Sequence, residues 1–182
     1  MKNLAVLIIL AVVAQTQVFA AGLEKSEILP LTAQLQRGTM PSFNARDGSD
    51  KHFSRKELEA LVGPQTKRIA LVFFATWCIP CTEGVILLRD NQAELDKNGI
   101  QVVLINASEL DIPKIKNWIK TNGNEKWPLV LDKFGNVQRN TGLITATQTE
   151  MLFPKTILLD NELKPLLLIG AEGKDWPEIL WK

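Results

Sequence analysis

Cys78 and Cys81 are the residues of this sequence whose type and spacing most directly suggest chemistry. They are the only two cysteines among 182 residues, and the residues between them, Ile79 and Pro80, are uncharged. The apolar run 69–74 before them is typical of a buried strand, and the stretch after them is typical of a helix. A helix N-terminus offers unpaired backbone N–H groups and a partial positive charge, which favour a thiolate over a thiol. We therefore predict thiol–disulfide exchange in which Cys78 attacks and Cys81 resolves the mixed disulfide.

The first 20 residues have the pattern of a secretory signal peptide. Lys2 precedes an apolar run from Leu4 to Ala14, and a small-residue cleavage pattern ends at Ala20. We predict cleavage after Ala20 and export to the periplasm or another extracytoplasmic compartment. The alternative is an uncleaved N-terminal membrane anchor, although the apolar run is shorter than the roughly 20 residues that a spanning helix needs.

Residues 21–182 have a length that suits one domain with a sufficient core. Loss of Lys2 with the signal peptide reduces the 21 basic residues to 20, against 20 acidic residues. This balance gives no electrostatic basis for binding nucleic acid. A domain of this size does not need one disulfide as a staple, which weakens a purely structural role for Cys78 and Cys81.

The apolar pattern predicts alternating strands and helices over residues 41–182, after an extended lead-in over 21–40. Strands are expected at 69–74, 100–105, 128–131, 156–159 and 166–169, with a further hairpin within 43–53. Helices are expected from Ser54 with a capping box, from about Cys78 to Asn98, from Asp111 to about Asn122, near 136–140 and within 175–181. This order predicts an α/β fold with a largely parallel central sheet, whose last two strands form an antiparallel hairpin.

Residues 73–81, Phe-Phe-Ala-Thr-Trp-Cys-Ile-Pro-Cys, resemble the active-site signature of exported TlpA/ResA-type thiol–disulfide oxidoreductases of the thioredoxin superfamily. The resemblance covers about residues 41–170 and departs at Phe74, where the family commonly has Trp. It implies a thioredoxin-like fold with a central mixed sheet flanked by helices and an N-terminal β-hairpin extension. It implies no cofactor.

A second resemblance lies at Phe153-Pro154, where the family has a cis-proline before a strand. It implies that the backbone N–H and C=O of Phe153 pair with an extended substrate segment near Cys78. The alternative is an ordinary loop proline. Trp77 is either a partner-facing aromatic residue or a packing residue. The segment 144–152 is longer than the usual approach to the cis-proline, and both partner selection and a tolerated insertion remain open.

Two positions that commonly carry a carboxylate in related proteins do not carry one here. By resemblance, thioredoxin has a buried Asp where this chain has Val72, and the TlpA/ResA branch commonly has a Glu where it has Gly84. Such carboxylates help to move the proton of the resolving thiol, so we expect slower or differently poised exchange. Glu83 is a candidate for proton transfer, but it lies about 200° around the helix from Cys81, which favours a solvated surface role.

The functional interpretations differ in the direction of exchange. The resemblance implies reduction of protein disulfides, for instance in apocytochrome c, with electrons from a membrane thiol-transfer protein. Oxidation or isomerisation of protein disulfides is a second interpretation, and a non-catalytic binding module with a structural disulfide is a third. His52 is the only histidine and lies in the predicted hairpin, so we expect no metal site.

Overall fold

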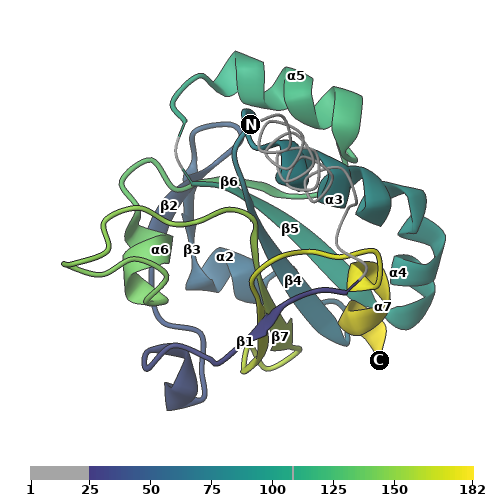
Figure 1. Cartoon of the computed structure of the whole chain (residues 1–182), viewed down its shortest axis with the longest axis horizontal. Coiled ribbons are helices and arrows are strands. Elements are labelled where there is room, and N and C mark those ends of the chain that lie inside the picture. Colours follow the sequence, from purple (N-terminus) through teal and green to yellow (C-terminus); the bar gives the residue numbers. More distant parts are fainter. Residues whose placement is uncertain (1–24, 108) are drawn as a thin grey trace, which may run out of the picture.

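The computed structural model describes residues 25–107 and 109–182, which form one eight-stranded sheet with helices on both faces (Figure 1). The strand order is β1-β8-β7-β4-β5-β6-β2-β3. The strands are β1 (Ile28–Leu29), β2 (Asn44–Asp47), β3 (His52–Ser54), β4 (Arg68–Phe74), β5 (Ile100–Asn106), β6 (Leu129–Leu131), β7 (Lys155–Asp160) and β8 (Pro165–Ile169). The helices are the 3₁₀ turn η1 (Leu35–Arg37), α2 (Arg55–Glu59), α3 (Ile79–Asp90), α4 (Gln92–Asn98), α5 (Ile112–Asn122), α6 (Asn136–Asn140) and α7 (Trp176–Trp181).

The sheet is mixed, as the resemblance implies, and the prediction of a largely parallel sheet is wrong. Within the described residues, β4 pairs with β5 and β5 with β6 in parallel, while every other neighbouring pair is antiparallel. The short connections from β2 to β3 and from β7 to β8 can join only antiparallel strands. The predicted final hairpin is confirmed as the β7–β8 pair, and the α/β class is confirmed with it.

Strand β4 is buried on both faces, which explains its continuous apolar sequence. Its residues Ile69, Leu71 and Phe73 pack into the core that also holds side chains of η1, α2 and α6. The intervening residues 70, 72 and 74 pack into a second core, formed with α3, α4, α5 and α7. The end of this central strand therefore delivers the cysteine motif to the start of α3, which covers the second core.

The N-terminal segment is part of the folded domain and not only an extended lead-in. Residues Ile28 and Leu29 of β1 pair with β8, and the side chains of Leu35 and Met40 are 0% exposed. The backbone N–H of Met40 also donates a hydrogen bond to the carbonyl of Leu163 at 2.8 Å. The apolar residues of this segment find partners far along the chain, which local patterns do not reveal. The predicted signal peptide, residues 1–20, lies outside the described residues.

The helix predicted from Cys78 to Asn98 is interrupted at Asn91. Helix α3 ends at Asp90 and α4 begins at Gln92, while Asn91 has φ −102° and ψ 15°. The side-chain amide of Asn91 donates to the carbonyl of Leu87 at 2.8 Å. Asn side chains compete with the helix backbone for hydrogen bonds in this way, so a single Asn can divide a helical pattern.

The shorter local predictions are confirmed. Strands β2 and β3 form the expected hairpin, and Ser54 and Glu57 make the capping box at the start of α2. Asp111 caps α5 by accepting a hydrogen bond from the backbone N–H of Lys114 at 3.0 Å. These features depend on residues close together in the sequence, which is why sequence patterns find them.

Candidate active site

Cys78 and Cys81 lie where β4 leads into α3, and their sulfur atoms are joined in a disulfide with Cα atoms 5.3 Å apart. Cys78 is the N-cap residue of α3, and its Sγ accepts a hydrogen bond from the backbone N–H of Cys81 at 3.2 Å. Both cysteines are buried in the second core, with Cys78 4% exposed and Cys81 1% exposed, but Cys78 also lines a surface cavity of about 440 Å³ whose lining does not include Cys81. The structure thus makes Cys78 the sulfur that a partner reaches first.

The chemistry of this arrangement follows from the helix start. Pro80 occupies the first turn, where a missing N–H costs no hydrogen bond, and the backbone N–H of Cys81 donates to Sγ of Cys78. Such donors, together with the helix dipole, stabilise a thiolate on Cys78 after reduction. The pair can therefore attack a second disulfide through Cys78 and close again through Cys81.

Three further predicted site residues gather around Cys78. The Phe153–Pro154 peptide bond is cis, as predicted, and the ring of Phe153 meets Trp77 edge-on with centroids 5.5 Å apart. Trp77 is 62% exposed, so the aromatic ring faces outward even though it touches Phe153. Among the described residues, no hydrogen bond is recorded to the backbone N–H or C=O of Phe153. These groups are free to pair with a substrate segment, which remains a prediction.

The segment 144–152 is fixed at both ends and exposed between them. Ile144 and Met151 are buried in the first core, and the N–H of Thr145 donates to the carbonyl of Gln148 at 2.8 Å. Leu152 is 72% exposed and lines the cavity beside Cys78. The segment therefore contributes to the rim of the cysteine site, whichever of its two predicted roles applies.

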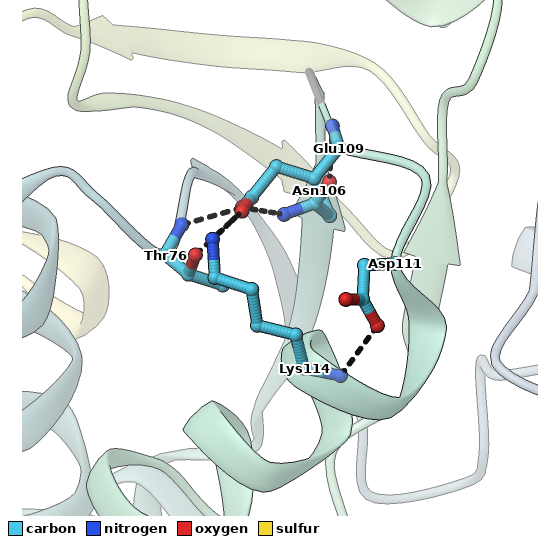
Figure 2. A network of polar contacts seen from close by, with 5 residues as sticks. All are labelled: Thr76, Asn106, Glu109, Asp111 and Lys114. Atoms are coloured by element: carbon cyan, nitrogen blue, oxygen red, sulfur yellow. Dashed lines mark hydrogen bonds and ion pairs between the residues drawn. The ribbon is translucent and has the colours of Figure 1, made fainter.

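A carboxylate that the sequence analysis did not identify holds the loop before the cysteines. Glu109 accepts hydrogen bonds from the N–H of Thr76 at 2.6 Å, from the Thr76 hydroxyl and from the side-chain amide of Asn106 at 3.0 Å (Figure 2). Lys114 adds an ion pair at 2.9 Å from the first turn of α5. Because β4 and β5 are parallel neighbours, their carboxyl ends bring Thr76 and Glu109 to the same edge of the sheet.

Glu109 is ionised over a wide pH range. Burial tends to raise its pKa, but the hydrogen bonds from Thr76, Lys114 and Asn106 outweigh burial and lower the pKa from 4.5 to about 2. The sequence signal for this role is the position of Glu109 just after the end of β5, the strand that lies next to β4, which leads into the cysteine motif.

The three positions considered for proton transfer differ in their surroundings. Glu83 is exposed on α3, and no hydrogen bond or ion pair to it is recorded in the described part of the chain. Val72 and Gly84 are both buried, Val72 in β4 and Gly84 on the face of α3 that also carries Cys81. Glu83 thus points away from the cysteine core, whereas Val72 and Gly84 border it.

The structure places a carboxyl group from the C-terminal segment between Val72 and Gly84. Glu172 accepts a hydrogen bond from the hydroxyl of Thr156 at 2.7 Å, and Thr156 is the ladder partner of Val72. A Cβ atom added to Gly84 would lie 2.5 Å from Oε2 of Glu172. Glu172 as a residue is partly exposed, but its Oε2 is buried and has no hydrogen-bond partner among the described residues.

Burial dominates the ionisation of Glu172. It raises the pKa of this carboxyl from 4.5 to about 8, against the lowering effects of the Thr156 hydrogen bond and the positive charge of Lys155. Burial likewise lowers the pKa of Lys155, while Glu27 and Glu172 raise it. Sequence analysis missed Glu172 because it follows the last strand, far from the motif, and only its flanking residues Gly170 and Gly173 hint at close packing.

His52 lies away from the cysteines, on strand β3 beside Glu57, with its Nδ1 3.7 Å from a carboxylate oxygen. Among residues 25–107 and 109–182, no group of three or more His, Cys, Asp or Glu side chains is placed to hold a metal ion. In the same residues, no helix is both long and apolar enough to cross a membrane.

Comparison with known proteins agrees with this geometry. The model of the AhpC/TSA family matches residues 37–164, a range that contains the cysteines, Glu109 and Pro154 and ends before Glu172. The chain is 26% identical over 132 residues to the thiol-disulfide oxidoreductase ResA of Bacillus thuringiensis subsp. konkukian, covering 72% of this chain and 68% of the relative.

Two solved structures are similar along most of their length. One is a thiol:disulfide interchange protein of the thioredoxin family from Chlorobium tepidum, with a TM-score of 0.59, 27% identity and coverage of 79% of this chain and 94% of that chain. The other is the thioredoxin domain of a thiol-disulfide oxidoreductase from Bacteroides vulgatus, with a TM-score of 0.60, 17% identity and coverage of 84% and 96%. These likenesses confirm the predicted thioredoxin-like fold.

Proposed function

The chain belongs to the AhpC/TSA family and is a thiol–disulfide oxidoreductase of the thioredoxin type, and we propose that it reduces protein disulfides outside the cytoplasm. The observation that carries the proposal is the position of the Cys78–Cys81 pair at the start of α3, beside an exposed apolar surface. We call this surface the docking surface and define it by Trp77, Ile79, Leu152 and Phe153. Its residues Ile79 and Leu152 are 73% and 72% exposed. A non-catalytic binding module is disfavoured by the family assignment.

The proposed reaction exchanges two electrons and two protons. The Cys78 thiolate attacks one sulfur of the substrate disulfide, and the other substrate sulfur leaves as a thiolate and takes up a proton. Cys81 then attacks Cys78, which restores the Cys78–Cys81 disulfide and releases the second substrate sulfur. The dithiol is oxidised and the substrate disulfide is reduced. The docking surface supports a polypeptide substrate, held by its backbone along Phe153 and Pro154.

The direction of exchange follows from how strongly the reduced pair is stabilised. A strongly oxidising pair needs a strongly stabilised thiolate. Here Ile79 and Pro80 are uncharged, so the start of α3 supplies most of the stabilisation of the Cys78 thiolate. Because no charged residue between the cysteines adds to this stabilisation, the arrangement supports a reductase. Equilibration with dithiothreitol or glutathione mixtures tests this. A potential near −270 mV is expected, and a value near −120 mV would instead establish the oxidase or isomerase alternative.

Two matched cysteine variants test the mechanism. The Cys78→Ser variant should lose dithiothreitol-coupled reduction of insulin, whereas Cys81→Ser should accumulate mixed disulfides with its substrates. An oxidised Cys-x-x-Cys-His peptide of apocytochrome c is the specific substrate to test. We propose that a membrane thiol-transfer protein returns the electrons. Wild-type protein without insulin or peptide reduction would argue for the binding module.

We also propose that residues 1–20 direct export and are removed after Ala20. The support is the basic start, the apolar run and the small-residue pattern of the sequence. N-terminal sequencing of the protein recovered from the extracytoplasmic fraction should begin at Ala21. Recovery of an intact N-terminus in the membrane fraction would establish the anchored alternative.

A further inference from the structure

The resolving thiol has a proton to lose in a place that water reaches poorly. Cys81 is 1% exposed and is packed in the second core with Val72, Leu158 and Trp176. Apolar surroundings raise the pKa of a thiol, yet only the thiolate attacks a disulfide. Resolution of the mixed disulfide therefore benefits from a base inside the protein, within reach of Cys81.

Glu172 is placed to be that base. Cys81 and Gly84 lie three residues apart on the same buried face of α3, where side chains at this spacing are neighbours with Cβ atoms about 5–6 Å apart. Oε2 of Glu172 occupies the space directly outside Gly84, 2.5 Å from where a Cβ would stand. Oε2 of Glu172 thus lies against the same buried face of α3 that carries Cys81.

The hydrogen bonds of Glu172 leave one oxygen available. Oε1 accepts from Thr156, whereas Oε2 is buried without a partner among the described residues. In another buried carboxyl, that of Asp132, both oxygens are occupied: Oδ1 accepts a hydrogen bond from the backbone N–H of Val137 and Oδ2 from that of Gln138, each at 3.1 Å. An unpaired buried carboxyl oxygen is costly and is a feature of sites that move protons.

We propose that Glu172, supplied by the segment after β8, is the acid–base partner of Cys81. In the mixed disulfide, the Cys81 thiol gives its proton to Glu172, and the resulting thiolate attacks Sγ of Cys78. The Cys78–Cys81 bond forms, the bond from Cys78 to the substrate sulfur breaks, and that sulfur leaves with the electron pair and takes a proton from solvent. On re-reduction, a donor thiolate attacks Cys78, and Cys81 leaves and recovers its proton from Glu172.

The ionisation of both groups supports the transfer. The pKa of Glu172, about 8 in the oxidised protein, lies close to the value of about 8.5 for an ordinary thiol. A carboxyl whose pKa is raised toward that of a thiol is better suited to accept the thiol proton and return it than a carboxyl with an ordinary pKa. The titratable and polar groups that interact with the Glu172 carboxyl are Thr156 and Lys155, both on β7, and Glu27 interacts with Lys155 from the segment before β1.

The test compares Cys78→Ser with Cys78→Ser/Glu172→Gln, in which Cys81 is the single cysteine. The rate of Cys81 alkylation by iodoacetamide is measured from pH 5 to pH 11. With Glu172 present, the thiol and carboxyl titrate as a coupled pair, so the profile has two steps. In the Glu172→Gln background the profile should have one step at a lower midpoint, because a neighbouring negative charge is gone. Superimposable profiles would overturn the proposal.

A second measurement follows resolution itself in otherwise wild-type protein. A mixed disulfide on Cys78 with a chromogenic thiol should resolve at least tenfold more slowly at pH 7 in Glu172→Gln, with the difference vanishing above about pH 9, where hydroxide removes the proton. Glu172→Asp should recover part of the rate, and Glu178→Gln, an exposed residue of the same segment, serves as the matched control. Slowing that is equal at all pH values would indicate a structural role only.

The inference rests on exchange through Cys78 and Cys81 but not on its direction. If the potential identifies an oxidase, the alkylation profiles still decide whether Glu172 is coupled to Cys81. If the profiles superimpose, insulin reduction still decides the proposed function. Should Glu172→Gln fail to fold, the test becomes an NMR titration of wild-type protein that follows the carboxyl ¹³C shift of Glu172 against pH. A titration that moves between the oxidised and reduced states is expected, and an identical titration in both would contradict the proposal.

Discussion

Replacing Glu109 with Gln tests whether one carboxylate holds the loop before the cysteines. Glu109 accepts two hydrogen bonds from Thr76, one from Asn106 and an ion pair from Lys114 (Figure 2). All of these partners are donors. A Gln side chain of the same shape keeps one accepting oxygen but turns its amide N–H₂ toward donors, so part of the network must break.

The magnitude can be worked from the pKa of Glu109, which is lowered from 4.5 to about 2. At about 1.4 kcal/mol per pH unit, this corresponds to at most about 3.5 kcal/mol of pH-dependent stability. The Glu109 side chain is 10% exposed but that of Lys114 is 55% exposed. The ion pair therefore contributes less than about 1 kcal/mol, and the hydrogen bonds from Thr76 and Asn106 supply most of the effect.

The direction of the pH dependence of stability follows from the pKa of Glu109, which is lower in the folded than in the unfolded protein. The stabilisation is fully present above pH 4.5 and is lost as the pH falls through about 2. Urea unfolding of the oxidised protein, followed by tryptophan fluorescence, should show Glu109→Gln destabilised by about 2–3 kcal/mol at pH 7. The difference in unfolding free energy between wild type and Glu109→Gln should narrow steadily below pH 4.5. Glu125→Gln, at an exposed position, is the control. A gap that is constant down to pH 3, or below about 0.5 kcal/mol at pH 7, would refute the reasoning.

The remaining predictions concern packing and burial. Gly84→Ala should destabilise the protein by about 1–3 kcal/mol despite a helix-propensity gain of about 1, because its Cβ would meet Oε2 of Glu172 at 2.5 Å and the Trp176 ring at 2.9 Å; a higher urea midpoint would contradict this. Leu35→Ala should cost about 2–5 kcal/mol, since this side chain is 0% exposed, and an unchanged midpoint would show that the N-terminal segment is dispensable. Glu172→Gln should stabilise the oxidised protein relative to wild type at alkaline pH. Because the pKa of Glu172 is raised to about 8 in the folded protein, wild type loses stability as the pH rises from 4.5 through 8, by at most about 5 kcal/mol. Parallel stability–pH curves for the Glu172→Gln variant and wild type would rule this out.

The sequence predicts elements whose causes are local. The continuous apolar run of β4 reflects burial on both faces, and the capping box of Ser54 and Glu57 lies within four consecutive residues. The Cys78–Cys81 pair at the start of α3 and the cis bond before Pro154 are also found where the motif and the resemblance indicate. In each case the residues that determine the feature are adjacent in the chain.

The features that sequence analysis missed depend on residues distant in the chain. Leu35 is buried by side chains from several elements of the first core, and β1 pairs with a strand about 140 residues later, as its partner Ile169 shows. The break at Asn91 depends on whether its side-chain amide bonds to solvent or, as here, to the backbone carbonyl of Leu87. Glu109 was missed because its partner Thr76 lies 33 residues away, on the neighbouring strand's edge.

Gly84 shows most clearly that comparing residue types position by position can miss a side chain that reaches the same site from elsewhere in the chain. By position, Gly84 and Val72 mark two missing carboxylates, which led us to expect slower exchange. In the structure, Glu172 lies between these two positions, and a side chain at residue 84 would collide with it. Gly84 and Glu172 are therefore coupled: the glycine makes room for a carboxyl that reaches the cysteine core from another part of the chain. If Glu172 exchanges its proton with Cys81, the absence of an acid at residue 84 gives no reason for slow resolution.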